Sequence, residues 1–134
     1  MVHAGSRRLE TLSQTRVRLV HDRLGKVQIL HVLGDCDLTS SRALEEALSA
    51  LTRDSETVIV SFLECGYIDS TCLAVLTRHQ RERRTRLFVV SNPDSQCRLL
   101  LDTVRLDLTV PVCNDFREVF RRLPPAPGYH ESAP

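Results

Sequence analysis

The stretch V-I-V-S-F-L-E-C-G-Y-I-D-S-T-C-L-A-V-L, residues 58–76, contains the change from strand to helix that decides the fold. Its first part belongs to a β-branched, apolar run, residues 57–62, which predicts a buried strand. A short turn follows, and a helical apolar pattern begins at about Ser70. The junction carries a carboxylate, two hydroxyls and a thiol in a row. We therefore expect a buried strand that delivers polar side chains to the start of a helix.

The same alternation extends in both directions along the chain. Strands are predicted at residues 16–22, 27–33, 57–62, 86–90 and 108–112. Helices are predicted to begin near Ser41, Ser70, Pro93 and Phe116, the last two with Asn92 and Asn114 as N-caps. The first two strands flank a glycine-containing turn and predict an antiparallel hairpin. Strands that alternate with helices then imply an α/β fold, a mixed and mostly parallel sheet with about four to five helices packed on it.

The length of 134 residues is that of a single domain. Residues 1–15 are polar and predict a flexible arm, 16–123 carry the domain pattern, and the Pro-rich residues 124–134 predict a disordered tail. We find no apolar run long enough for a signal peptide or a membrane span. The five cysteines are odd in number and widely spread, which is unlike a secreted disulfide scaffold. We therefore expect a cytoplasmic protein with no membrane partner.

The bulk charge argues against several classes of ligand. The net charge is +1 and aromatic residues are 4% of the chain, so neither a basic field nor a base-stacking surface is present. One basic run, residues 78–86, lacks interleaved aromatic residues and suits the end of a helix. The glycines are isolated and form no phosphate-binding loop. Nucleic acid, metals and nucleotide cofactors are therefore not expected.

The tripeptide Asp69-Ser70-Thr71 lies where a parallel strand ends and a helix begins. Unpaired N–H groups and the helix dipole stabilise an anion there, so a phosphoryl group on Ser70 would be supported. The same residues can also be a simple helix cap. A nucleophile elbow would need flanking glycines, which I-D-S-T-C lacks, so we do not expect an enzyme. Asp35 and Asp37 share another loop at a strand end, where they form either a cation site with Asp69 or a solvated turn.

The cysteines form neither a C-x-x-C pair nor a zinc pattern with histidine. Cys97 lies on an apolar helical stripe and predicts a core residue. Cys72, near a helix start, is a candidate for a lowered pKa, and Cys65 precedes it by seven positions. Both a redox role and burial as small apolar side chains are consistent with this pattern.

Several motifs, in this order, resemble the STAS domain of bacterial anti-sigma factor antagonists. Residues 30–39, L-H-V-L-G-D-C-D-L-T, resemble the family's strand that ends in Gly-Glu-Leu-Asp, with Asp37 at the family's Asp. Residues 58–76 resemble its apolar strand, turn and Asp-Ser-Ser/Thr-Gly-Leu signature. Residues 87–93, L-F-V-V-S-N-P, and 101–107, L-D-T-V-R-L-D, resemble its later strand and helix. The resemblance covers residues 17–123.

The resemblance implies a regulator that is not an enzyme and has no cofactor. Such an antagonist binds an anti-sigma factor that is also a serine kinase, and so releases a sigma factor. The kinase then phosphorylates the serine after the Asp, here Ser70, which ends the complex, and a serine phosphatase resets the switch. The partner-binding residues would be Asp35, Asp37, Thr39, Ser40, Asp69, Ser70, Thr71 and Cys72.

The chain also departs from the family pattern. Cys72 replaces the usual Gly, Asp35 the usual Glu and Cys36 the usual apolar residue, and residues 104–106 lack the usual Gly. Two alternatives therefore stay open. One is a STAS subunit that is not phosphorylated and acts as a scaffold in a larger complex, such as one for lipid transport. The other is a redox-responsive antagonist that uses Cys72 with Cys65 or Cys113.

Overall fold

The computed structural model describes residues 7–9, 17–53, 55–82 and 85–123, with the backbone alone for 7–9. The strands are β1 (Arg7–Leu9), β2 (Arg18–Leu24), β3 (Val27–Cys36), β4 (Thr57–Ile68), β5 (Arg86–Val90) and β6 (Val112–Cys113). The α-helices are α1 (Ser41–Arg53), α2 (Ser70–Glu82), α3 (Gln96–Thr103) and α4 (Phe116–Arg122). Two 3₁₀ turns, η1 (Leu38–Ser40) and η2 (Leu106–Leu108), complete the described elements. The predicted tail, 124–134, and most of the predicted arm, 1–15, lie outside the described residues.

The strands form one sheet whose spatial order follows the chain, from β1 to β6. The first three pair antiparallel, and β3 to β6 pair parallel. This confirms the predicted mixed sheet with an N-terminal hairpin. It also adds β1, which pairs with β2 inside the segment expected to be an arm. The hairpin turn lies between Leu24 and Val27, and Gly25 adopts a positive φ of 63° that an L side chain disfavours.

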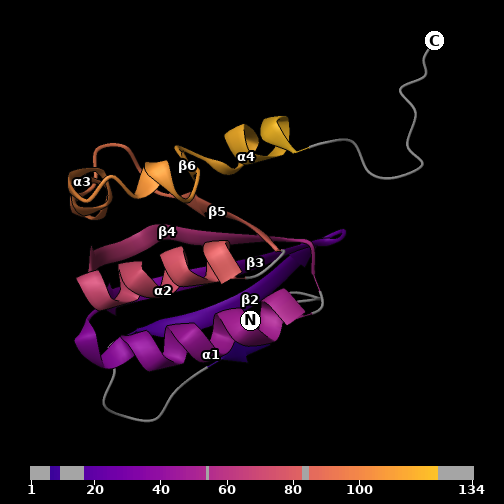
Figure 1. The fold of residues 1–134 in the computed structure, drawn as a ribbon, viewed down its shortest axis with the longest axis horizontal. Helices are drawn as coiled ribbons and strands as arrows, with labels where there is room; N and C mark the ends of the chain where they lie inside the picture. The colour runs from indigo at the N-terminus through magenta and orange to yellow at the C-terminus, as the bar shows by residue number, and fades with distance from the viewer. Residues whose placement is uncertain (1–6, 10–16, 54, 83–84, 124–134) are drawn as a thin grey trace.

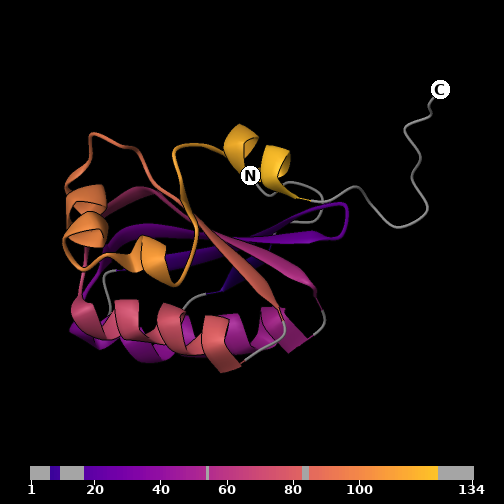
Figure 2. The ribbon, with the colours of Figure 1, turned by 45° about the horizontal axis from the view of Figure 1, so that its top comes forward.

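Helices cover both faces of the sheet (Figure 1). Figure 2 shows α1 and α2 side by side under one face and α4 on the opposite side. The larger core lies under α1, α2 and α3, where the fully buried side chains include Leu30, Leu44, Leu48, Val60, Phe62, Leu76 and Leu101. A smaller core under α4 joins Ile29, Ile59, Phe88, Val90, Cys113 and Val119. Strands buried on both faces explain the continuous apolar runs of β4 and β5.

The strand at the centre of the sheet is longer than predicted. The sequence predicted a strand at 57–62 and then a turn, whereas β4 continues without interruption to Ile68. The reason is its neighbour: β3 pairs with β4 as far as Cys36↔Ile68, with two register shifts that absorb extra residues of β4. Residues Glu64 to Gly66, which suggested a turn in the sequence, therefore lie within a paired strand.

Helix starts and the last strand also differ from the prediction. Asn92 does not cap α3, because its side chain accepts a hydrogen bond from Asp94 N (2.9 Å) in a preceding turn, and Ser95 is the N-cap. Asp115, rather than Asn114, caps α4 by accepting from Glu118 N at 2.8 Å. The strand predicted at 108–112 is wrong over most of its length. Its first residue belongs to η2, and only Val112 and Cys113 pair with β5.

An ion-pair cluster joins α1 to α2. Glu45 of α1 lies between Arg78 and His79 of α2, and its Oε2 is 2.9 Å from His79 Nε2. Burial raises the pKa of Glu45, but the hydrogen bonds and charges of His79 and Arg78 lower it more, so the net shift is downward. The ionised carboxylate is therefore favoured in the folded state.

Stability should depend on pH through Glu45. Because its folded-state pKa lies below the unfolded value of 4.5, its contribution is complete above that value and is lost as the pH falls through the folded-state pKa. Glu45→Gln should destabilise the protein by less than about 1 kcal/mol at neutral pH, since the carboxylate is partly exposed. Urea denaturation should show this difference shrinking towards pH 3 (about one and a half units below the unfolded value). Glu46→Gln, at an exposed i,i+4 pair with Arg42, is the control and should show little pH-dependent difference. A constant Glu45→Gln deficit across the pH range would contradict the prediction.

Candidate functional site: two capped helix starts at the carboxyl ends of β3 and β4

Ser70 is the first residue of α2 and is exposed. Asp69 caps the helix, because its Oδ1 accepts from Thr71 N at 2.8 Å and from Thr71 Oγ1 at 2.7 Å. The carbonyl of Asp69 accepts from Leu73 N at 3.1 Å and so begins the helical hydrogen bonds. Among the described residues, none forms a hydrogen bond with the Ser70 hydroxyl. The two neighbouring hydroxyls therefore differ, since Thr71 is engaged in the cap and Ser70 is available.

The loop after β3 repeats this arrangement. Asp37 Oδ1 accepts from Thr39 N (3.0 Å), Thr39 Oγ1 (2.6 Å) and Ser40 Oγ (3.2 Å). The sequences D-L-T and D-S-T thus form the same Asp-x-Thr cap at two helix starts. Ser40 is fully buried, so it supports this loop from below, whereas Thr39 is exposed.

The two caps lie together because β3 and β4 end side by side. The N–H of Asp69 donates to the carbonyl of Cys36 at 2.8 Å, one residue before Asp37. The thiol of Cys72 lies beneath the same loop, with its Sγ 3.4 Å from the carbonyl oxygen of Asp37. The sequence placed these residues near each other from strand order, and the structure brings Asp37, Thr39, Asp69, Ser70 and Cys72 into one region.

Asp35 lies apart from this group. It is one residue before Cys36, whose side chain is in the core beneath α1 and α2, so the Asp35 side chain lies on the opposite face of the sheet. There it approaches Gly66, where an added Cβ would be 3.1 Å from Asp35 Oδ1. In the ranges that the structure describes, no three His, Cys, Asp or Glu side chains are grouped so as to hold a metal ion. Asp35 therefore does not join Asp37 and Asp69 in a cation site.

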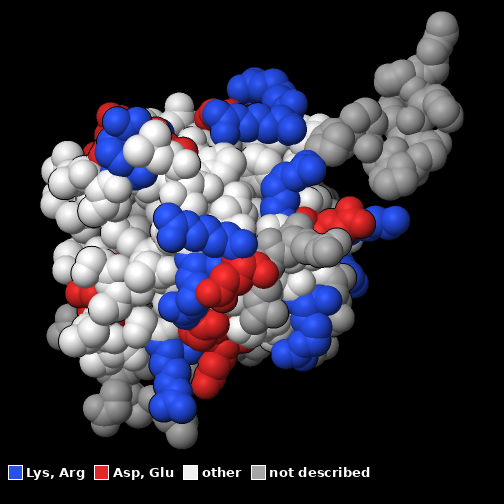
Figure 3. Space-filling view, viewed as in Figure 1, with Lys and Arg blue, Asp and Glu red and all other residues white. Residues whose placement is uncertain are grey.

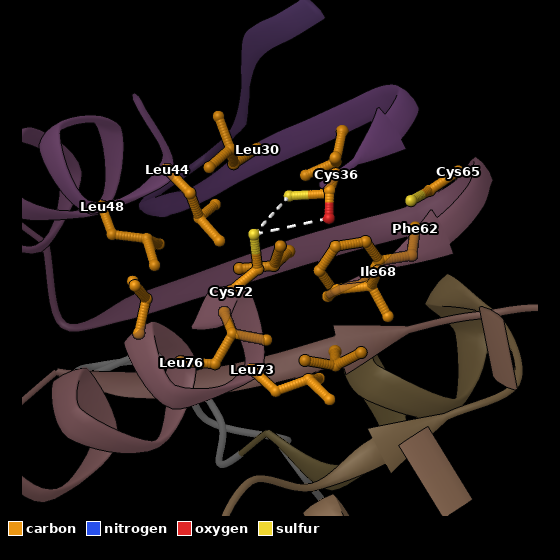
Figure 4. Close-up of a cluster of buried hydrophobic side chains, with 14 of the residues drawn as sticks. Leu30, Cys36, Leu44, Leu48, Phe62, Cys65, Ile68, Cys72, Leu73 and Leu76 are labelled. Carbon is orange, nitrogen blue, oxygen red and sulfur yellow. Dashed lines mark hydrogen bonds between the residues drawn. The ribbon is translucent and has the colours of Figure 1, made fainter. Parts of the chain in front are cut away.

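The structure gives Cys72 a different neighbour from the one that the redox alternative assumed. All five are buried, and Cys72 contacts Cys36, with 3.2 Å between the two Sγ atoms, rather than Cys65 or Cys113 (Figure 4). Cys65 donates to the carbonyl of Tyr67 at 3.0 Å, and a hydrogen bond with Cys97 lowers its pKa. Cys113 belongs to the smaller core on the other face of the sheet. The predicted set of Cys65, Cys72 and Cys113 is not brought together.

Exposed apolar residues lie next to the two caps, and the sequence analysis did not single them out. Leu38, between Asp37 and Thr39, is 63% exposed, and Tyr67, two residues before Asp69, is 42% exposed. Figure 3 shows a largely uncharged surface over the beginning of α2, and the charged side chains of that helix follow in its later turns. The beginning of α1 differs, because Arg42, its second residue, is exposed. Leu38 could have been found from the sequence, because an apolar residue inside a polar cap sequence is expected to be exposed. Such a surface suits a protein partner.

A comparison with protein-family models decides the family. The model described as "Mlab, STAS domain" matches residues 19–111. The chain belongs to the STAS-domain family. A search of curated proteins gave no match. Among the described residues, no helix has the length and apolar character needed to cross a bilayer.

Solved structures with a similar fold include anti-sigma factor antagonists. One from Mycobacterium paratuberculosis has a TM-score of 0.72 and 20% identity, over 82% of this chain and 97% of the other. The antagonist SpoIIAA in its unphosphorylated form gives 0.58 and 15%, over 79% and 96%. The Bacillus cell fate determinant SpoIIAA in the phosphorylated form gives 0.56 and 15%, over 78% and 97%. At these identities the likeness establishes the STAS fold.

The Asp69 cap should contribute measurably to stability. Asp69→Ala removes the acceptor of Thr71 N and should cost about 0.5 to 2 kcal/mol in the free energy of unfolding. Asp69→Asn keeps a side-chain oxygen acceptor and should cost less than about 0.5 kcal/mol. Urea denaturation followed by circular dichroism measures both. Equal losses in the two variants would show that the charge of Asp69, rather than its cap, stabilises the helix start.

Proposed function

We propose that this STAS domain is a non-enzymatic anti-sigma factor antagonist that is switched off by phosphorylation of Ser70. In its unphosphorylated form it binds an anti-sigma factor with serine-kinase activity and so releases a sigma factor. A serine phosphatase restores the binding form. The observation that carries the proposal is the exposed Ser70 hydroxyl at the capped start of α2, within a STAS fold whose structural neighbours are antagonists.

The geometry of the cap favours Ser70 over Thr71 as the phosphoryl acceptor. Thr71 Oγ1 donates to Asp69 Oδ1 at 2.7 Å, so phosphorylation of Thr71 would remove one of the two hydrogen bonds of the cap. Ser70 can be modified with the cap intact. Its position at the first turn of a helix also supports a new anion through the helix dipole. The domain can therefore stay folded after phosphorylation while its surface changes.

The change in surface charge accounts for a switch. A phosphoserine adds about −1.5 to −2 charges and three strong acceptors. It would stand beside Asp69 and near the Asp37 loop, in a region where Leu38 and Tyr67 present apolar surface. A partner surface fitted to a neutral hydroxyl would then have to desolvate the phosphate or meet repulsion from its charge. A loss of about 1.4 kcal/mol in binding free energy lowers the affinity tenfold. A loss of a few kcal/mol on phosphorylation is therefore enough to dissociate the complex.

Cys72 does not obstruct this function, although it replaces the family's usual Gly. Its side chain is fully buried and lies towards Cys36 and the backbone of the Asp37 loop (Figure 4). The surface around Ser70 therefore gains no side chain from the substitution. Ser70 and Thr39 are the exposed hydroxyl residues at the two helix starts, and Thr39 Oγ1 already donates to Asp37.

Phosphorylation should be specific to Ser70. Incubation with the anti-sigma serine kinases of the source bacterium and ATP should add one phosphoryl group, a mass increase of about 80 Da. Ser70→Ala should abolish the increase, and peptide mapping of the wild type should locate it at residue 70. Ser41→Ala, at the equivalent start of α1, is the matched control and should still be modified. Modification of Thr71, or an unchanged increase in Ser70→Ala, would contradict the assignment.

Partner affinity should respond to charge at position 70 rather than to side-chain size. Ser70→Asp should weaken anti-sigma factor binding by about tenfold or more, because it adds a charge to the interface. Ser70→Asn has nearly the same shape without the charge and should retain most of the affinity. Isothermal titration calorimetry compares the two variants with the wild type. Equal affinities for Ser70→Asp and Ser70→Asn would exclude a charge-operated switch at this position.

A second candidate function is a STAS subunit that is not phosphorylated and acts as a scaffold in a larger complex, such as one for lipid transport. The observation that favours it is the description of the matched family model, "Mlab, STAS domain". Affinity purification from the source bacterium separates the two functions. Recovery of transporter subunits, with equal yield for Ser70→Asp and wild type, supports the scaffold. Recovery of an anti-sigma factor that Ser70→Asp loses supports the antagonist.

A further inference from the structure

Two buried thiols lie in contact directly beneath the two caps. Cys36 is the last residue of β3, Cys72 is the third residue of α2, and 3.2 Å separates their sulfur atoms (Figure 4). Both side chains have no solvent exposure. The residues are 36 positions apart in the sequence, so the fold, rather than a local motif, creates the pair.

The surroundings of the pair make Cys72 the more acidic of the two thiols. The hydrogen bond from the Cys36 thiol lowers the pKa of Cys72, against the opposing effects of burial and of the Asp69 charge. The same interaction, together with burial, raises the pKa of Cys36. Cys72 also lies in the first turn of α2, where the helix dipole stabilises a negative sulfur. Cys72 therefore loses its proton more readily than Cys36, which lies in contact with it.

We propose that Cys36 and Cys72 form a reversible disulfide when the protein meets a peroxide, and that this bond fastens the end of β3 to the start of α2. The Cys72 thiolate attacks one oxygen of hydrogen peroxide, which gives a sulfenic acid and hydroxide. The Cys36 thiol then attacks the sulfenic sulfur, forms the S–S bond and releases water. Overall two thiols lose two electrons and two protons, and one peroxide becomes two waters. A dithiol reductant reverses the change by thiol–disulfide exchange.

The distances make this step short. An S–S bond measures about 2.05 Å, so the sulfurs must approach by about 1 Å. The Asp37 loop lies against the Cys72 thiol, and it is held in part by the hydrogen bond from Ser40 N to Asp37 O at 2.9 Å. A local opening of this single turn would admit a molecule as small as peroxide. Closure of the bond would also end the contacts of the Cys72 thiol with the carbonyls of Cys36 and Asp37.

The position of the bond gives it a consequence for the site, and this part of the inference rests on the proposed function. The disulfide would join the residue before Asp37 to a residue of the same helical turn as Ser70. The two caps could then no longer separate or adjust independently when a partner binds. We expect the oxidised and reduced forms to differ in anti-sigma factor affinity by about tenfold.

The test is to treat the folded wild-type protein with hydrogen peroxide, alkylate the remaining thiols and map the peptides without reduction. We expect a cross-linked Cys36–Cys72 peptide that dithiothreitol removes. Cys36→Ala and Cys72→Ala should each lack it. Cys113→Ala, a cysteine buried in the other core, is the matched control and should retain it. Because the decisive measurement is made on wild type, it holds even if a variant folds poorly.

Three results would overturn the proposal: full alkylation of both thiols after oxidation, a link of Cys72 to Cys65 instead, or a Cys65–Cys97 link alone. Titration of the anti-sigma factor with the oxidised and reduced protein then tests the consequence separately. Equal binding of both forms would refute the regulatory role and leave the disulfide established. Binding of neither form would count against the proposed function and not against the cross-link.

Discussion

The parallel pairing of β3 with β4 places every residue of the site. It continues to the last residue of both strands, Cys36 opposite Ile68, and the Asp69 N–H then adds one more bond to the Cys36 carbonyl. Both strands contribute side chains to the larger core beneath α1, α2 and α3, so burial as well as backbone hydrogen bonds holds the pair together. The two Asp-x-Thr caps start from adjacent strand ends for this reason. A slip of one residue would bring the opposite side chains into the core and separate the caps.

Much of this arrangement could be predicted from the sequence. The alternation of strand and helix patterns gave the mixed sheet, and the polar tripeptide after an apolar strand gave the start of α2 at Ser70. These predictions succeed because burial of one face of a helix or strand imposes a period on the apolar residues, and that period can be read from the sequence. The position of Asp37 near Asp69 followed from the rule that parallel strands end at one edge of a sheet.

The remainder depends on contacts that have no local signal. The full length of β4 could not be predicted, because Glu64 and Gly66 suggest a turn until β3 is known to pair with them. Ser95 and Asp115, rather than Asn92 and Asn114, cap the helices because their side chains accept from the N–H groups of the first turn. The predicted caps precede the observed ones by three residues and by one residue, which no local pattern resolves. The contact of Cys36 with Cys72 joins residues 36 positions apart, and the sequence pointed instead to Cys65 as the near neighbour of Cys72.

The unequal pairing of β4 has a consequence for how the molecule moves. β5 pairs with β4 only from Thr57 to Ser61, so this first part of β4 lies between two strands. From Phe62 to Ile68, β4 pairs with β3 and not with β5. Amide protons should therefore be protected most strongly at the entry of the strand into the core and progressively less towards Ile68. The strand is thus paired on both sides where it enters the core, and it depends on β3 and on the buried Cys65 and Ile68 where it leads to Ser70. Local opening of the domain should therefore begin at this end of β4, while the rest of the sheet stays paired.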